Sequence, residues 1–313
     1  MSLLIQYTLL FAAVLSLVAL GGCFSEHSGV INLGLEGIMI VGALGGAVAM
    51  ALIPTTVPAG VMVISVSLIA IAAGVLYSVL LGFASINFKA DQTLIGTAMN
   101  MLATAAATII ARTINASRDA GNVSNTLAYI DANSAFTVNI GSFRFNWFML
   151  MALAALLISH FVLYKTKFGL RLRACGENPS AADSVGINVT KMRWAGVLIS
   201  GVLGGLGGIV YITCGVSQWD FSVGANGFGF LALAVMIFGQ WKPGHIGLAA
   251  LLFGFFRALS NVYSGFGWLA AINIPSAVYN MMPYIISLIV LAFTSKNSAA
   301  PKSEGIPYDK GKR

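Results

Sequence analysis

Polar side chains inside apolar stretches are the residues of this sequence with the clearest potential for chemistry. Asn32 and Glu36 are four positions apart, so a helix places them on one face. A carboxylate within a membrane-spanning helix is by default a candidate for binding an ion or a polar solute. A structural role is the alternative, because Glu36 falls in the first turn of its expected helix, where the helix dipole favours an acid.

A second polar set follows one face of the apolar stretch 93–112. Its members recur every three or four residues: Thr93, Thr97, Asn100, Thr104 and Thr108. Threonine hydroxyls can bond their own helix backbone, so Asn100 is the more informative residue. It either pairs with another helix or faces a water-filled path. The predicted solute-pathway residues are therefore Asn32, Glu36, Thr97, Asn100 and Thr104.

Catalytic and metal-binding patterns do not emerge from the sequence. It has no G-x-x-x-x-G-K-[ST] phosphate loop. Its three histidines are far apart and have no local nucleophile or carboxylate arrangement around them. Its three cysteines, at 23, 175 and 214, fit neither a disulfide framework nor a zinc site. We therefore predict no catalysis by this chain, no metal site and no cofactor.

Composition indicates a membrane protein. Of 313 residues, 58% are hydrophobic and 9% are charged, with a mean hydropathy of +0.88. Soluble domains carry about 25% charged residues. The net charge of +7 is not a nucleic-acid footprint, because the basic residues gather in loops beside apolar segments.

The predicted fold class is an all-α polytopic membrane protein with about nine transmembrane helices, within a range of roughly eight to ten. Glycine pairs such as Gly42 and Gly46 predict close helix packing, as do the glycines between 201 and 208. Two shorter segments joined by 240–244 resemble the interrupted spans of a transport path. The expected segments are 3–20, 33–53, 60–85, 93–112, 147–164, 194–214, 228–239, 245–259 and 277–293.

Basic residues predict the orientation in the membrane. Loop 165–193 carries six of the 17 basic residues and the tail 295–313 carries five more, which places both in the cytoplasm. Counting segments backwards puts 113–146 and the N-terminus outside. A re-entrant piece near Leu33 would reverse the terminus. Residues 1–294 form one transmembrane domain in this scheme, and the Pro/Ser/Lys-containing tail is expected to be disordered.

The polar loop 165–193 contains signals for a short helix. Asn178 suits an N-cap, Pro179 suits the first helical position and Gly186 suits the stop. The side chains expected to be exposed are small: Ser180, Ala181, Ala182 and Ser184. One interpretation is an incidental helix in a connecting loop. The other is a docking knob offered to a soluble partner.

Three stretches resemble the membrane permeases of ABC importers, in the branch for sugars, nucleosides and branched-chain amino acids. They are GGCFSEHSGVINLGLEGIMIVGA (21–43), FKADQTLIGTAMNMLA (88–103) and GLRLRACGENPSAADSVGINV (169–189). The likeness is greatest to the shorter of the two permeases of nucleoside importers, and it covers most of the chain.

The resemblance implies that loop 165–193 holds the cytoplasmic coupling helix that contacts the ATPase. Its matching residues are Gly176, Glu177, Asn178, Pro179, Ala181, Ala182 and Gly186. The resemblance further implies ATPase subunits on partner chains, a second homologous permease forming a mixed pair, and an external substrate-binding protein. The expected location is the bacterial cell membrane.

Other cargoes and other classes of transporter stay open at this stage. Simple sugars or branched-chain amino acids are alternative cargoes within the same family. From another class, an ion-coupled secondary transporter would use Glu36 as its coupling carboxylate. A passive channel is the third possibility.

Overall fold

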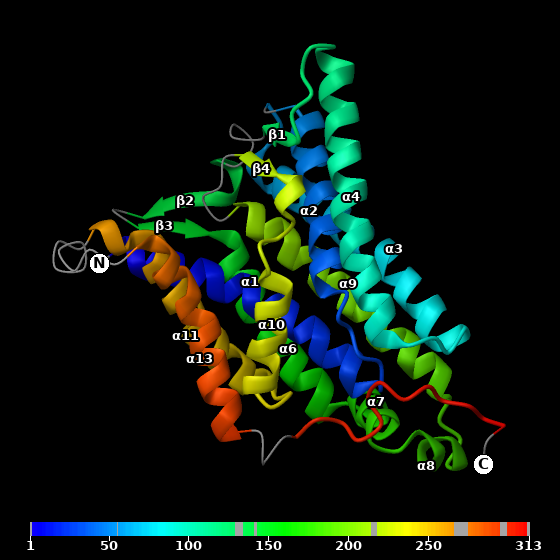
Figure 1. The fold of residues 1–313 in the computed structure, drawn as a ribbon. Coiled ribbons are helices and arrows are strands. Elements are labelled where there is room, and N and C mark those ends of the chain that lie inside the picture. The colour runs from blue at the N-terminus through cyan, green and yellow to red at the C-terminus, as the bar shows by residue number, and fades with distance from the viewer. Residues whose placement is uncertain are drawn as a thin grey trace.

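The computed structural model describes residues 2–54, 56–128, 134–140, 143–213, 218–265, 275–294 and 299–311. Figure 1 shows a bundle of tilted helices. Within the described residues, seven helical segments are long and apolar enough to cross a membrane: Leu3–His27, Leu35–Leu52, Ala59–Asn87, Gln92–Arg118, Trp147–Lys165, Val189–Thr213 and Pro243–Val262. The chain is a polytopic helical membrane protein, as predicted.

The longer helices are α1 (Ser2–His27), α2 (Leu35–Leu52), α3 (Ala59–Gly82), α4 (Gln92–Arg118), α6 (Trp147–Lys165), α9 (Val189–Thr213), α11 (Pro243–Val262) and α13 (Ser276–Thr294). A π-helical turn, η1 (Phe83–Asn87), continues α3. The short apolar helix α10 (Phe228–Phe238) and α13 lie at two further predicted segments. The count of nine membrane crossings stays a prediction.

Helix α1 is longer than the sequence predicts. The expected segment ends at Leu20, whereas the helix continues to His27 and buries Glu26 in its last turn. Gly21 and Gly22 lie inside the helix, where the absence of a side chain lets them pack closely against α9 and α10. A side-chain carbon at Gly21 would lie 3.2 Å from the carbonyl oxygen of Ser200. The expected loop containing Glu26 and His27 is therefore corrected to the end of a helix.

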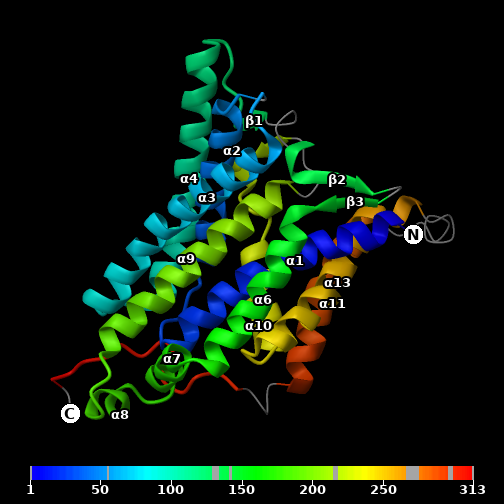
Figure 2. The same cartoon turned by 180° about the vertical axis from the view of Figure 1, so that it is seen from behind.

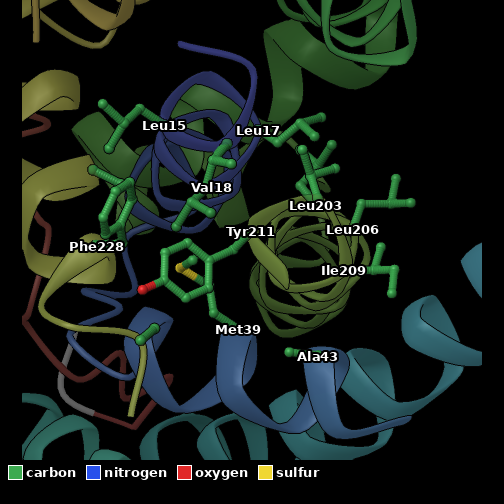
Figure 3. Packing of buried hydrophobic residues seen from close by; sticks show 14 of the residues in the cluster. Leu15, Leu17, Val18, Met39, Ala43, Leu203, Leu206, Ile209, Tyr211 and Phe228 are labelled. Carbon is green, nitrogen blue, oxygen red and sulfur yellow. The ribbon is translucent and has the colours of Figure 1, made fainter. Parts of the chain in front are cut away.

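Glycines bring α2, α3 and α9 into close contact, as the small-residue pattern predicts. A side-chain carbon added at Gly42 would lie 2.5 Å from the Cα atom of Gly205, and one at Gly74 would lie 2.8 Å from the same atom. Side chains larger than hydrogen would separate these helices. Figure 3 shows the adjoining core, where Val18 of α1, Met39 of α2 and Tyr211 of α9 pack together.

Short strands and small helical turns cap one side of the bundle. Strand β1 (Thr126–Ala128) pairs antiparallel with β4 (Gln218–Asp220), and β2 (Thr137–Ile140) pairs with β3 (Phe143–Asn146). The N-terminus lies beside β2 and β3 in Figures 1 and 2. Three 3-10 turns, η2 (Ser134–Phe136), η3 (Phe221–Val223) and η4 (Tyr263–Gly265), complete the described elements.

The opposite side carries α7 (Lys167–Glu177), α8 (Pro179–Ser184) and the C-terminal tail (Figure 2). The tail differs from the predicted disorder over residues 299–311. Pro301 is buried, and the Ser303 N–H donates to the carbonyl of Gly176 at 2.8 Å. The prediction of disorder rests on the residue types of the tail alone. That composition does not show that Tyr308 packs on apolar residues of α7, α8 and α9.

Candidate functional site

A cavity of about 740 Å³ lies between α2, α4, η3 and α10. Its polar lining comes from α2, α4 and η3, and its apolar lining from α4, η3 and α10. The lining residues are Glu36, Thr97, Asn100, Met101, Thr104, Ala105, Thr108, Ile109, Ser222, Val223, Gly224 and Phe230. Four of the five predicted pathway residues meet here, namely Glu36, Thr97, Asn100 and Thr104.

Glu36 holds the start of α10. Its Oε1 accepts the N–H of Gly227 at 2.9 Å, and its Oε2 accepts the N–H of Gly229 at 2.6 Å. The first N–H groups of a helix lack partners within that helix, and an ionised carboxylate is their strongest acceptor. Glu36 therefore caps α10 from a neighbouring helix. The dipole of its own helix is not its main partner.

Asn100 joins α4 to the start of α2. Its side-chain oxygen accepts the Gly37 N–H at 2.7 Å, and its side-chain nitrogen donates to the Leu33 carbonyl at 2.8 Å. The residue is 9% exposed. Of the two interpretations of Asn100, the interhelical pair is present in the structure, and the same side chain also borders the cavity.

The threonines bond within α4. The Thr97 hydroxyl donates to the Thr93 carbonyl at 2.5 Å, and the Thr104 hydroxyl donates to the Asn100 carbonyl at 3.1 Å. Each hydroxyl oxygen keeps acceptor capacity on the cavity side. Such groups offer a solute weak hydrogen bonds without leaving a buried donor unpaired.

Asn32 lies away from the cavity. It is fully buried, and its side-chain nitrogen donates to the Ser200 hydroxyl of α9 at 2.8 Å. The helical spacing does not place it beside Glu36, because α2 begins only at Leu35 and Asn32 precedes it. The cavity lining therefore does not include this predicted pathway residue.

Cavity residues that the sequence reasoning missed come from the segment after β4. Ser222 and Gly224 line the cavity, and Asp220 holds the turn by accepting the Ser222 N–H at 2.9 Å. The two hydrogen bonds from Ser222 lower the pKa of the Asp220 carboxyl. The Asp-x-Ser spacing and Gly224, whose φ is 62°, are typical of a turn. They give no sign of which helix face the turn meets.

The short helix in loop 165–193 is present as predicted. Helix α8 spans Pro179–Ser184, and the Asn178 side chain accepts the Ala181 N–H at 3.0 Å. Gly186 follows with φ of 84°, a conformation that suits glycine. The sequence did not predict α7, which precedes it and buries Leu172 and Cys175.

Exposure on α8 differs from the prediction at Ala182. That side chain is 3% exposed and packs with Cys175, Val189 and Tyr308. The expectation that it faces outward is wrong, because α8 lies on α7 and α9 through this side chain. Gly176 is buried as well, and a side-chain carbon there would lie 2.4 Å from the His27 carbonyl. The exposed residues around α8 are Glu177, Asn178, Ser180, Ala181, Ser184, Val185 and Gly186.

The family model for branched-chain amino acid transport system / permease components matches residues 4–291. The chain belongs to this permease family. Similar proteins include the guanosine ABC transporter permease protein NupQ of Bacillus subtilis (strain 168), which is 41% identical over 100% of this chain and 98% of its own length. The nucleoside ABC transporter permease protein NupC of Lactococcus lactis subsp. cremoris (strain MG1363) is 37% identical over the same shares.

A third relative has a different relation to this permease. The guanosine ABC transporter permease protein NupP, also of Bacillus subtilis (strain 168), is 27% identical over 90% of this chain and 78% of its own length. The same strain therefore has two guanosine permease proteins, and this permease matches one of them along nearly its full length. The resemblance inferred from the sequence motifs is confirmed.

The chemistry of the cavity lining is that of hydroxyl and apolar groups. Within the residues that the structure describes, no group of three His, Cys, Asp or Glu residues is placed to hold a metal ion. The cavity instead combines hydroxyl oxygens of α4 with Phe230 and Met101. Its size falls within the roughly 300–1,000 Å³ of small-molecule sites.

Proposed function

We propose that this permease is the membrane subunit of an ABC importer for nucleosides. The observation that carries the proposal is the full-length similarity to NupQ and NupC, at 41% and 37% identity. The chain forms the path for the solute. ATP is hydrolysed on partner subunits, and an external binding protein delivers the cargo.

The cavity between α2, α4, η3 and α10 is the proposed nucleoside path. Nucleosides carry hydroxyl groups on the ribose and a flat base. Thr97 and Thr104 offer hydroxyl oxygens, and the Phe230 ring and Met101 offer apolar contact. Since the hydroxyls already donate to their own helix, they bind a solute weakly, and weak binding permits release.

The exposed face of α8 is the proposed ATPase contact. Ser180, Ala181 and Ser184 are exposed there, and Val185 is 75% exposed. Small side chains leave room for the wall of a groove in the partner. The buried Ala182 ties this face to α7 and α9, so that movement of the ATPase reaches the membrane helices.

A second, homologous permease is the proposed neighbour on the cavity side. Met101, which lines the cavity, is 74% exposed in this chain. The cavity therefore reaches the surface of the subunit, and another chain would close it. The presence of two different guanosine permease proteins, NupQ and NupP, in one strain supports a mixed pair.

The proposed orientation places α7, α8 and the tail in the cytoplasm of a bacterial cell. Basic residues in this loop and in the tail support it. Val123 and Val185 are 76% and 75% exposed and are suitable for cysteine substitution. Val123 lies between α4 and β1, Val185 directly follows α8, and β1 and α8 lie on opposite sides of the bundle in Figure 1. In a background without native cysteines, an impermeant thiol reagent should label intact cells only through Val123→Cys. Labelling at both positions would contradict the orientation.

Uptake into vesicles distinguishes this function from ion-coupled transport. The assembled complex should take up a nucleoside only with ATP and the binding protein. Uptake by this chain alone in an ion gradient would instead support the secondary transporter. Glu36 argues against that alternative, because protonation or ion binding would compete with its bonds to the Gly227 and Gly229 N–H groups. A ligand screen on the cognate binding protein would identify the cargo.

A further inference from the structure

The C-terminal tail, residues 299–311, crosses the whole side of the molecule that carries α7 and α8 (Figures 1 and 2). Its hydrogen bonds, ion pairs and close contacts reach several separate parts of the chain. The residues that it meets are Glu26 at the end of α1, Ile31, Lys89, Gly176 with Glu177, Asp183, Arg193 and Gln240.

Ser303 of the tail caps the C-terminus of α7. Its N–H donates to the Gly176 carbonyl at 2.8 Å, and its hydroxyl donates to the Glu177 carbonyl at 3.1 Å. The last carbonyls of a helix receive no hydrogen bond from an N–H group of the same helix. The tail satisfies two of them directly before Asn178, the N-cap of α8. It therefore fixes the point where α7 passes into α8.

Arg193 attaches the tail to the first turns of α9. The Arg193 side chain is 1% exposed, and its Nη2 donates to the Ile306 carbonyl at 2.9 Å. A buried guanidinium needs such acceptors because leaving it unpaired is costly. Gly305, with φ of 75°, lets the tail turn beside Ile31 immediately before this bond.

Tyr308 attaches the tail to α8 itself. Its ring joins the apolar cluster of Ala182, Cys175 and Val189. Burial in this cluster raises the pKa of the Cys175 thiol to about 11. Two ion pairs flank the ring, Lys89 with Asp309 at 3.0 Å and Lys310 with Asp183 at 3.7 Å. Exposed ion pairs add little, so the apolar packing of the Tyr308 ring dominates this contact.

A polar groove of about 550 Å³ runs between α8 and the tail. Asp183 and Gly186 form one wall, and Tyr308, Asp309 and Lys310 form the other. A partner that seats on the exposed face of α8 therefore also meets the tail.

We propose that the tail is a second element of the ATPase-coupling surface, which locks α8 to α1, α7 and α9 and forms one wall of the groove beside α8. This inference rests on the proposed function. While the tail is in place, a displacement of α8 moves α9 by two routes. One is the connecting segment 185–188, and the other is the tail, through Tyr308 and the Ile306–Arg193 bond. Loss of the tail lets α8 move without the membrane helices.

The test uses the complete transporter in vesicles, with its ATPase, second permease and binding protein. Tyr308→Ala removes the ring from the α8 cluster, and truncation before Ala299 removes the whole tail. Lys302→Ala is the matched control, because Lys302 is exposed in the same segment. Nucleoside uptake and ATP hydrolysis are measured together, with ATPase co-purification and melting temperature as assembly controls.

We expect both tail variants to raise the ATP consumed per nucleoside by roughly threefold to thirtyfold, with the ATPase still bound. Unchanged stoichiometry in Tyr308→Ala, with wild-type melting, would overturn the proposal. If the truncated chain fails to assemble, the proposal is tested by Tyr308→Ala and by a cross-link between α8 and the tail. A bis-maleimide bridge between Asp183→Cys and Lys310→Cys should leave uptake intact, and loss of uptake on bridging would also overturn the proposal. A wild-type complex without ATP-dependent uptake would instead refute the proposed function.

Discussion

The cavity and the side that carries α7 and α8 use polar groups in opposite ways. Along α4, the threonine hydroxyls bond to carbonyls four residues earlier in the same helix. On the α7–α8 side, the hydrogen bonds of the tail join distant parts of the chain. Ser303 meets Glu177 at a separation of 126 residues, and Ile306 meets Arg193 at 113.

This difference separates two mechanical requirements. A solute path works when its polar groups bind weakly and can be released without unfolding a neighbour. A coupling surface works when it moves as one body, which requires bonds between elements. Asn100 and Glu36 are the exceptions in the cavity, because they bond across helices while bordering the space for the solute.

Ala181→Trp should have the largest effect on the coupling side. Ala181 is exposed on α8, so a large ring there fills the space proposed for the ATPase and leaves the chain folded. We expect uptake and ATPase co-purification to fall by roughly tenfold to a hundredfold, the range for overfilled contacts. The melting temperature of the purified permease should stay near that of the wild type.

Ala182→Trp provides the contrast. Its side chain is buried against α7 and α9, so the ring overfills the permease itself and should lower the melting temperature and the membrane level. Full transport by Ala181→Trp would refute the docking face. Equal melting of the two variants would refute the assignment of inner and outer sides of α8.

Asn100→Leu should have the next largest effect, and it tests the exception in the cavity. The change leaves the Gly37 N–H and the Leu33 carbonyl without their partner. Each lost buried bond costs about 1 to 3 kcal/mol, so the melting temperature in detergent should fall. Uptake of every nucleoside should fall in proportion to the surviving protein. A changed cargo ranking with normal melting would show instead that Asn100 acts mainly on the solute.

Glu304→Gln should have a moderate effect, which depends on pH. The Glu304 carboxyl of the tail lies close to the Glu26 carboxyl at the end of α1, so the two groups interact electrostatically. Burial raises the pKa of the Glu304 carboxyl above its ordinary 4.5. Its contribution to tail docking is therefore complete below that ordinary value and is lost as pH rises through the raised pKa. Cys23, His27 and Arg173 surround the same helix end.

Trypsin cleavage after Lys302 measures this docking. Cleavage in the wild type should become faster as pH rises from near 4.5 through the raised pKa of Glu304, after correction for trypsin activity. Glu304→Gln should reduce this difference, because it removes one of two interacting carboxyls and leaves Glu26. Glu177→Gln, with its exposed side chain at the end of α7, should keep it. A wild-type difference that persists in Glu304→Gln would assign the pH response to another group.

Local signals explain what could be predicted from the sequence. Helix α8 follows from Asn178, Pro179 and Gly186, which act within one or two turns. The α4 stripe follows from helical periodicity, and four of the five pathway residues meet at one cavity. The position of Asn32 away from the cavity could not be predicted, because residue spacing cannot tell where the helix begins. Three features could not be predicted because they depend on residues far away in the sequence. They are the burial of Ala182, the continuation of α1 beyond Leu20 and the contacts of the tail.

Thr97→Val and Thr104→Val should have the smallest effects, and they test whether the cavity threonines contact the solute. Each change removes a hydroxyl whose hydrogen bond lies within α4, so melting should stay near that of the wild type. Thr113→Val is a matched control, because its hydroxyl also bonds four residues back, to the Ile109 carbonyl at 2.9 Å, and it does not line the cavity. A lost weak bond to a ribose hydroxyl should change the ratio of ribonucleoside to deoxynucleoside uptake by about twofold to fivefold. The control should leave that ratio unchanged, since only its own helix uses the hydroxyl. A wild-type uptake ratio in all three variants would remove the α4 hydroxyls from the solute path. The same departure from the wild-type ratio in all three would assign the effect to the helix rather than to the cavity.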